Sequence, residues 1–485
     1  MATKKDLVEA YSFSRRRLVT AFVSGAPGGR EVEPSRPGRA IIGGLALAVL
    51  FVAGAAVLGI LKSPVDIDLT KPQLVSEKES GADYVILAPE EGADPELRPV
   101  ANITSAMLLL GADVSPTVVP RNEITAVERG EGIGILEAPE TPPETGSLVP
   151  TGWTGCTGVV NGEPVGLKVD VAVQPQVTLT PDVSFVVTTD DGRLFLIAES
   201  TTGSDSRLSR AYAYPVPRGA SADRILQNVA ANSDQNAIRV PDDWLTMFPS
   251  GGALTLSTFG ISEADLGKPS PFRSDPAVPG RARIGDVLEV DDQRYVLTRS
   301  GALRLDEFSA AVYLNQSFPR GRTPRSRPAE VAPALNTPDA SDLPNAKWPT
   351  EVTTDRPPSE LCGQLITATG AEPRVLLGTP AIGSTASAAG IPSGGKETTV
   401  DSGRGAFVLS GDWDATGATG LTLIDDRGFR YPVAGQDEQD NLGFGAVPPV
   451  VVPASWVSLF GDGVPLSIDA ARCPPTSREQ ARPCG

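Results

Sequence analysis

The sequence of 485 residues contains no histidine, only four cysteines and few aromatic side chains. Without histidine, neither a Ser–His–Asp triad nor a Cys–His pair can form, and every histidine-ligated metal site is excluded. The five tryptophans are too few for a broad aromatic surface of the kind that binds sugars. These absences exclude most of the hydrolytic chemistry that an exported domain could perform, and the composition points to no cofactor.

Charge is absent from one long stretch, residues 40–61, with the sequence AIIGGLALAVLFVAGAAVLGIL. At a rise of about 1.5 Å per residue, a helix over this run is about 33 Å long, enough for the hydrocarbon core of a bilayer. The alternative is a cleaved signal peptide, whose apolar region is typically about 7–15 residues long. Because this run is longer and lies far from Met1, the sequence predicts a single transmembrane helix.

The two flanks of this run differ in charge. Residues 1–39 carry eight basic and four acidic side chains, whereas residues 62–485 carry 34 basic and 55 acidic ones. Because positive flanks stay in the cytoplasm, we expect a cytoplasmic N-terminus and a periplasmic or extracytoplasmic C-terminal region. The acidic balance of that region argues against binding to nucleic acid. Cysteines there are consistent with an oxidising compartment.

The N-terminal tail has the pattern of a basic amphipathic helix. Leu7, Tyr11, Leu18 and Phe22 recur at helical spacing, and Arg15–Arg17 lie on and beside the opposite flank. Such a helix could lie on anionic lipid, or it could dock onto a cytoplasmic partner. The sequence leaves both possibilities open.

The exported part repeats itself at an offset of 212 residues. VPDDWLTMFPSGGALTL at 240–256 shares Val, Pro, Trp, Phe, Gly and Leu with VPASWVSLFGDGVPLSI at 452–468. In each copy the Trp and Phe are four residues apart and share one face of a short helix. We therefore expect Trp244 with Phe248, and Trp456 with Phe460, to form repeat cores.

A second match, at an offset of 211, pairs a segment starting at Tyr84 with one starting at Tyr295. Both read as strand, turn, Leu-Arg, and then Ser-Ala opening an apolar helix. Strand-like runs at 183–200 and 420–435 each contain an Asp-Asp pair, which indicates hairpins. The exported region is therefore expected to be α+β, with two halves, roughly 67–270 and 283–472, packed as a pseudo-two-fold.

Two cysteines occupy equivalent places in these halves. Cys156 and Cys362 each follow a Pro-rich stretch, and a bridge between them would tie the halves near their axis. The alternative is a pair of free buried thiols, because free cysteine buries readily. Cys473 and Cys484 lie in a Pro-rich tail and read either as a small disulfide clip or as a reactive pair.

One loop nearly matches a phosphate-binding motif. Gly390, Gly395 and Lys396 fit G-x-x-x-x-G-K, but Glu397 stands where Ser or Thr must place a hydroxyl on Mg²⁺. A flexible Gly/Ser loop is the simpler interpretation. Arginines are also concentrated at 320–327, RGRTPRSR. This stretch reads as a solvated linker, or as a docking site for an acidic partner or lipid headgroups.

The order of parts resembles the EccB membrane subunit family of type VII (ESX) secretion systems. The resemblance rests on the helix Tyr11-x-Phe13-x-x-Arg16-Arg17, the Arg39-Ala40 entry to a single span, and paired repeats around two cysteines. It implies a bitopic protein whose elongated exported region has four small repeats around a central β-rich domain. It also implies assembly with the EccC motor ATPase, EccD and EccE, self-association of the exported parts, and contact with a mycosin protease.

The resemblance and the repeats together predict a domain order. The expected parts are a cytoplasmic tail at 1–39, a transmembrane helix at 40–61, repeat units at 62–138, 205–270 and 283–318, central-domain halves at 139–204 and 359–435, a Pro-rich linker at 319–358, and a fourth repeat with the tail at 436–485. The expected function is a structural subunit that anchors the complex and organises its outer face. The alternative is an ATP hydrolase, a designation that family members carry. Tyr11, Phe13 and Arg15–Arg17 are the expected docking residues.

Overall fold

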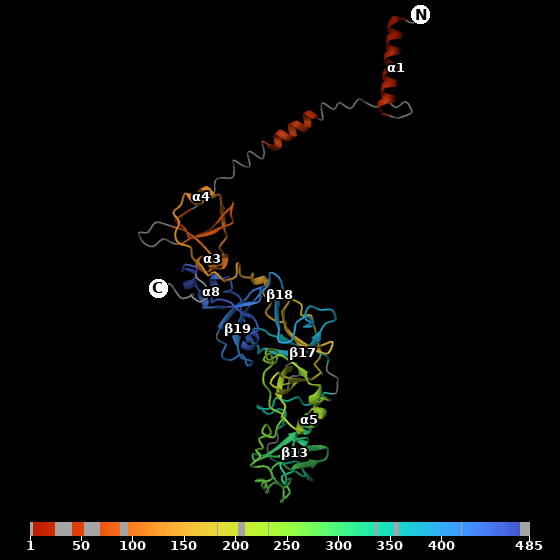
Figure 1. Ribbon diagram of the computed structural model, residues 1–485, viewed down its shortest axis with the longest axis vertical. Coiled ribbons are helices and arrows are strands. Elements are labelled where there is room, and N and C mark those ends of the chain that lie inside the picture. Colours follow the sequence, from red (N-terminus) through yellow and green to blue (C-terminus); the bar gives the residue numbers. More distant parts are fainter. Residues whose placement is uncertain are drawn as a thin grey trace. The chain divides into compact units, whose positions relative to one another are not determined.

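The computed structural model describes residues 3–24, 41–52, 68–87, 96–181, 183–201, 209–230, 232–334, 338–353, 358–418 and 420–475 (Figure 1). The chain divides into two compact units, Met1–Ile67 and Asp68–Gly485. The second unit carries all the strands described below and the predicted central domain.

The first unit contains the predicted N-terminal helix. Helix α1 (Lys4–Ser24) covers this stretch, and the side chains of Leu7, Tyr11, Leu18 and Phe22 are exposed. Of the predicted span 40–61, only 41–52 is described, and there the chain is helical. Among the residues that the structure describes, no helix combines the length and apolar character that crossing a bilayer requires.

Four sheets in the second unit share one topology. In each, three strands form an antiparallel meander, a helix follows, and the next strand returns parallel to the first. Repeat 1 contains β1 (Gln73–Glu77), β2 (Asp83–Ile86), β3 (Leu97–Pro99), α3 (Ile103–Leu110), β4 (Thr117–Val119) and α4 (Arg121–Thr125). Repeat 2 contains β8 (Phe185–Thr188), β9 (Leu194–Thr201), β10 (Ser209–Pro215), α5 (Ser221–Val229), β11 (Ile238–Arg239) and α6 (Asp242–Leu245).

The other two repeats follow the same order. Repeat 3 contains β12 (Val287–Val290), β13 (Gln293–Leu297), β14 (Ala302–Leu305), α7 (Glu307–Leu314) and β15 (Ser326–Pro328). Repeat 4 contains β19 (Ala406–Gly411), β20 (Gly420–Ile424), β21 (Phe429–Val433), α8 (Gln436–Asn441), β22 (Val450–Pro453), α9 (Ala454–Val457), β23 (Gly461–Asp462) and α10 (Ile468–Ala471). Strand β23 extends the repeat 4 sheet by pairing parallel to β21.

The helices predicted from the Tyr84 and Tyr295 segments begin in the same way. Asn102 caps α3 and Asp306 caps α7, and the side-chain oxygen of each accepts a hydrogen bond from the backbone N–H three residues on, at 2.8 Å. This bond satisfies one of the donors that a helix start leaves unpaired. The Ser-Ala pairs at these helix starts are therefore equivalent positions of one repeated unit.

Both predicted Asp-Asp hairpins are present, but they belong to different sheets from those expected. The turn at Asp190-Asp191 joins β8 to β9, and the turn at Asp425-Asp426 joins β20 to β21. The sequence boundaries place these hairpins in the central domain, whereas the structure pairs them within the repeat 2 and repeat 4 sheets. In repeat 2 the hairpin strand β8 also pairs with β11, and in repeat 4 the hairpin strand β20 also pairs with β19, so each hairpin is part of a repeat sheet.

The central sheet contains β5 (Trp153–Val160), β6 (Glu163–Val171), β7 (Val177–Leu179), β16 (Glu360–Ile366), β17 (Arg374–Pro380) and β18 (Lys396–Val400). Its order is β18-β6-β5-β16-β17-β7, so each half of the chain contributes three strands and sends its third strand to the other half. Cys156 lies opposite Cys362 at the middle pair. The symmetry stops at the edges, because β18 is parallel to β6 whereas β7 is antiparallel to β17.

The repeats pack in pairs that agree with the pseudo-two-fold. Helix α3 of repeat 1 contacts α8 and α10 of repeat 4, and α5 of repeat 2 contacts α7 of repeat 3. Buried side chains such as Leu108 with Phe444, and Leu226 with Phe308, form a shared core in each pair. Because repeat 1 corresponds to repeat 3 and repeat 2 to repeat 4, the two pairs are equivalent.

The stretch 319–358, predicted to be a linker, contributes to the fold. It supplies β15, the fourth strand of repeat 3, and the buried Trp348. The indole N–H of Trp348 donates to the Gly252 carbonyl at 2.8 Å, and its ring packs edge-on to Phe259 at 5.0 Å. The prediction of a linker, made from the proline content, was therefore wrong for this segment, which packs against repeats 2 and 3.

Candidate functional site

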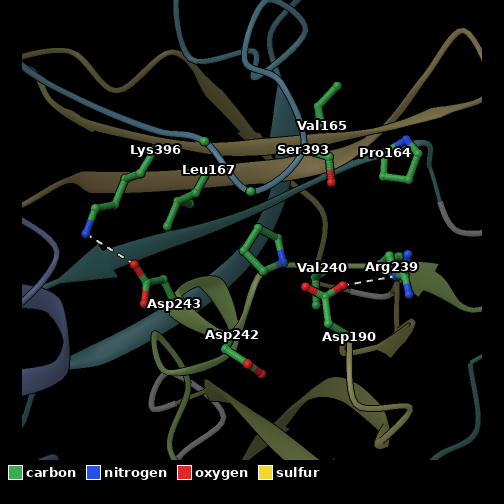
Figure 2. Close-up of a pocket in the computed structure, with 13 residues that line it drawn as sticks. Pro164, Val165, Leu167, Asp190, Arg239, Val240, Asp242, Asp243, Ser393 and Lys396 are labelled. Atoms are coloured by element: carbon green, nitrogen blue, oxygen red, sulfur yellow. Dashed lines mark hydrogen bonds and ion pairs between the residues drawn. The ribbon is translucent and has the colours of Figure 1, made fainter.

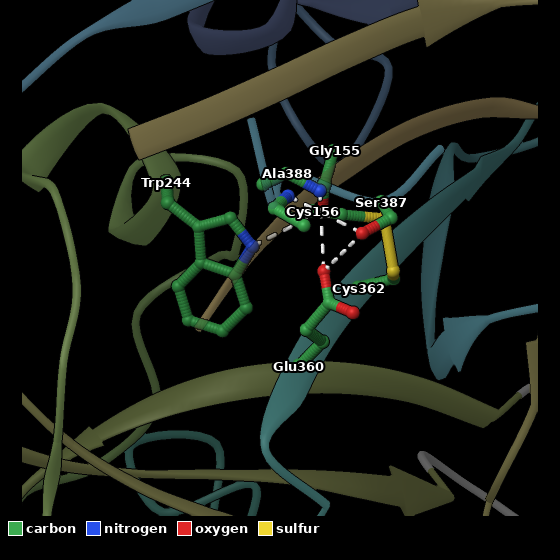
Figure 3. The surroundings of a disulfide bond; sticks show 8 residues. Gly155, Cys156, Trp244, Glu360, Cys362, Ser387 and Ala388 are labelled. Atoms are coloured by element: carbon green, nitrogen blue, oxygen red, sulfur yellow. Dashed lines mark hydrogen bonds between the residues drawn. A yellow bond between two sulfur atoms is a disulfide. The ribbon is translucent and has the colours of Figure 1, made fainter. Parts of the chain in front are cut away.

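The centre of the second unit is a buried disulfide between Cys156 and Cys362 (Figure 3). The two Cα atoms are 4.1 Å apart, and neither side chain is exposed. The loop after β17 covers the bond with the buried Ala386. Glu360 holds that loop in place, because its carboxylate accepts from the Ser387 hydroxyl at 2.7 Å and from the Ala388 N–H at 3.2 Å. The bridge therefore joins the halves where the sequence predicted.

Trp244 of α6 lies beside this disulfide and is fully buried (Figure 3). Its indole N–H donates to the carbonyl of Gly155 at 3.1 Å. A Cβ at Gly155 would come within 2.2 Å of the Met247 methyl carbon, so a side chain there requires the buried Met247 to move. At Gly363, which pairs opposite Gly155, the nearest atoms would be 3.1 Å away. These glycines allow the chain that follows α6 to pack directly on the central sheet.

The second tryptophan helix joins the same core. The indole N–H of Trp456 in α9 donates to the Met247 carbonyl at 2.9 Å, and Phe460 packs edge-on to Trp153 at 5.3 Å. All four predicted repeat-core aromatics, Trp244, Phe248, Trp456 and Phe460, are buried. They do not form two separate cores, because one continuous cluster contains them together with the central sheet.

Sequence comparison missed a third Val-Pro helix. Val119 and Pro120 precede α4 just as Val240 and Pro241 precede α6, with the proline at the N-cap in both. The Val-Pro pair itself is the signal that could have revealed it. The copy was concealed because α4 carries no tryptophan.

The near-match to a phosphate loop lines a pocket of about 260 Å³ (Figure 2). Lys396 is the first residue of strand β18, and its ammonium group forms an ion pair with Asp243 at 3.2 Å. Glu397 pairs with Lys168 of β6. A phosphate loop requires a helix N-terminus directly after its lysine. A strand follows instead, and although Gly395 lines the pocket, Gly390 does not.

The acidic residues around this pocket are held in ion pairs. Asp190 pairs with Arg239 at 3.1 Å (Figure 2). Asp242 pairs with Arg193 at 3.0 Å. Nearby, hydrogen bonds from the Thr189 hydroxyl and from Arg193 lower the pKa of Asp191 to about 2. No cluster of acids or cysteines within the described residues is arranged to hold a metal ion. Ion pairs at the pocket thus join β18 to α6 and to β6.

The remaining predicted site residues lie near the two ends of the chain. Tyr11, Phe13 and Arg15–Arg17 lie on α1 with exposed side chains. Cys473 is buried, and its carbonyl accepts from the Gly134 N–H at 3.0 Å. Cys484 lies outside the described residues, so its pairing stays a prediction.

Comparison with known proteins identifies the family. The protein-family model described as "Type VII secretion system ESX-1, transport TM domain B" matches residues 1–475. The chain belongs to the EccB family. Similar EccB proteins include the "ESX-1 secretion system ATPase EccB1" of Mycolicibacterium smegmatis, 28% identical over 97% of this chain and 94% of the relative. Another is the "ESX-3 secretion system ATPase EccB3" of Mycobacterium tuberculosis, 26% identical over 90% of this chain and 83% of the relative.

Solved EccB-like structures share the fold. A chain in an intact ESX-5 inner membrane complex superposes with a TM-score of 0.57 at 19% identity, covering 98% of this chain and 96% of that one. A chain of the EccB3 dimer from the ESX-3 core complex gives 0.56 at 19% identity, covering 83% and 100%. At 19% identity this similarity concerns the fold alone.

Proposed function

We propose that this chain is a structural subunit of a type VII secretion complex in the inner membrane. The observation that carries the proposal is the family match over residues 1–475. The exported unit supports it, because its halves are joined by a buried disulfide and exchange strands in one sheet. Such a body is suited to holding other subunits in fixed places.

In this proposal the N-terminal segment anchors the chain in the membrane. The apolar run 40–61 crosses the membrane once, and the charge difference of its flanks leaves residues 1–39 in the cytoplasm. Helix α1 then acts as a cytoplasmic hook through Tyr11, Phe13 and Arg15–Arg17. A tag at the N-terminus should be reachable only from the cytoplasm and one at the C-terminus only from outside. Finding both tags on the same side would overturn this arrangement.

The partners that we propose are the EccC motor ATPase, EccD, EccE, a mycosin protease and a second copy of this chain. The solved structures of relatives are an inner membrane complex and a dimer, which is the reason to expect assembly here. Replacing Arg15–Arg17 by glutamine should reduce recovery of EccC and EccD in neutral detergent. Undiminished recovery would mean that these arginines serve the membrane surface alone.

The names of EccB relatives suggest ATP hydrolysis, and substitution of Lys396 tests this alternative. In this chain its ammonium group pairs with Asp243, and a strand follows it. Full-length protein, Lys396→Ala and the exposed control Lys78→Ala should show the same ATP turnover, at the level of a mock purification. Turnover well above the mock that only Lys396→Ala abolishes would favour the hydrolase and refute the structural proposal for this loop.

A further inference from the structure

Repeat 3 carries a cleft of about 890 Å³ whose charge is opposite to that of the chain. Among the described residues, its lining has six arginines and one acidic residue, Asp286, which gives a net charge of +5 in a protein whose net charge is −17. The arginines are Arg273, Arg281, Arg283, Arg322, Arg325 and Arg327. The volume lies within the range of about 300–1,000 Å³ that is typical of ligand sites.

Asp286 orders the two segments that carry these arginines. Its carboxylate is buried, accepts from the backbone N–H of Arg283 at 3.0 Å and from that of Arg325 at 2.9 Å, and forms an ion pair with the Arg327 guanidinium. The preceding Gly285 has a φ of +96° and accepts from the Tyr313 hydroxyl at 2.6 Å. Asp286, the one acidic group among the described lining residues, is therefore bonded to both walls of the cleft.

The arginines fall into two groups. Arg283 donates to the Gly267 carbonyl at 2.7 Å and Arg322 to the Glu263 carbonyl at 2.6 Å, so both guanidinium groups are fixed by the protein, as is that of Arg327. The side chains of Arg273, Arg281 and Arg325 are exposed and make no hydrogen bond or ion pair within the described residues. The guanidinium groups of these three arginines are thus available to bind a ligand.

The composition of the cleft defines the ligand class. Every basic side chain in its lining is arginine, whose planar fork suits carboxylate and phosphate oxygens. None of the described residues that line it is aromatic, and Ile284 is the largest apolar one. This lining offers neither a stacking surface for a base nor a channel for an acyl chain. The ligand is therefore polar and carries several negative charges.

A sheet edge beside the arginines favours a polypeptide ligand. Strand β15, which includes Arg327, ends the sheet order β14-β13-β12-β15 and pairs with β12 alone among the described strands. An edge strand can bind an extended peptide through its backbone. We propose that this cleft binds an extended acidic polypeptide segment of a partner protein, with its carboxylates on Arg273, Arg281 and Arg325.

The test uses full-length protein in neutral detergent and a labelled peptide of alternating glutamate and threonine, followed by fluorescence anisotropy. The triple variant Arg273→Gln, Arg281→Gln, Arg325→Gln should bind about tenfold or more weakly, because three charge-assisted contacts are lost. The matched triple Arg218→Gln, Arg294→Gln, Arg299→Gln removes equal charge outside the cleft and should bind as the parent does. Equal weakening by both triples would reduce the effect to net charge and overturn the proposal.

Two further arms identify the ligand class and guard against misfolding. The triple reversal Arg273→Glu, Arg281→Glu, Arg325→Glu takes the described lining of the cleft from +5 to −1. It should lose the acidic peptide and gain a lysine–threonine peptide, which a misfolded variant would not do. Glutamine–threonine peptide should not bind. Inorganic polyphosphate or vesicles of anionic phospholipid that bind the cleft more tightly than the acidic peptide would assign it to phosphate groups and overturn the peptide proposal.

Discussion

Replacing both cysteines of the central disulfide, Cys156→Ala with Cys362→Ala, should cost the second unit a large part of its stability. The bridge closes a loop between residues 206 positions apart, which corresponds to about 5 kcal/mol of restricted unfolded-state entropy on the chain-entropy relation. Both sulfurs are fully buried beside Ala386. Their removal leaves a void that costs about 1 kcal/mol more for each.

The assay is urea unfolding of residues 68–485 followed by tryptophan fluorescence, because Trp153, Trp244, Trp348 and Trp456 are buried. The single variant Cys362→Ala is the matched control. It breaks the bridge but keeps one sulfur. Its loss of unfolding free energy should therefore be smaller than that of the double variant only by the cost of the second void. A double variant within about 1 kcal/mol of the parent would refute the reasoning from loop closure.

The remaining predictions concern the core and one turn. Trp244→Ala and Trp456→Ala should each cost about 3–5 kcal/mol, and their double variant should deviate from additivity because both contact Met247 or its neighbours in one cluster; additive unfolding free energies would indicate separate cores. Gly155→Ala should destabilise the fold by about 1–3 kcal/mol and Gly363→Ala by less, measured in the same urea assay; equal costs would contradict the packing. The pKa of Asp191 is lowered from 3.8 to about 2. Ionised Asp191 therefore contributes to the stability of the fold, fully above pH 3.8, and this contribution is lost as the pH falls through 2. Asp191→Asn should therefore flatten the acid limb of the melting-temperature profile, and an unchanged limb would contradict this assignment.

The repeats show how far sequence reasoning reached. Identical residues at offsets of 212 and 211 correctly paired repeat 2 with repeat 4 and repeat 1 with repeat 3. They did not reveal that all four share one topology, because a parallel return strand is defined by backbone pairing, for which β4 and β11 need no common side chains. The cysteine pairing was predictable, since symmetry placed both residues at the axis.

Two features of the central unit were harder to predict. Strand β18 pairs with β6, more than two hundred residues earlier, and no local pattern encodes such a contact. The Gly-rich approach to Lys396 drew attention to phosphate binding, whereas the Thr398-Thr399-Val400 run was the better signal, since β-branched residues favour strands. Trp348 was missed because the prolines around it suggested a linker.

The measurement that tests the central claim most directly is purification of the tagged full-length chain from its native membrane, with its associated subunits identified by mass spectrometry. The proposed structural role predicts one high-mass assembly that contains the other type VII membrane subunits in constant proportion, and Lys396→Ala should yield the same assembly. A chain recovered alone, or an assembly free of type VII subunits, would contradict the proposed function.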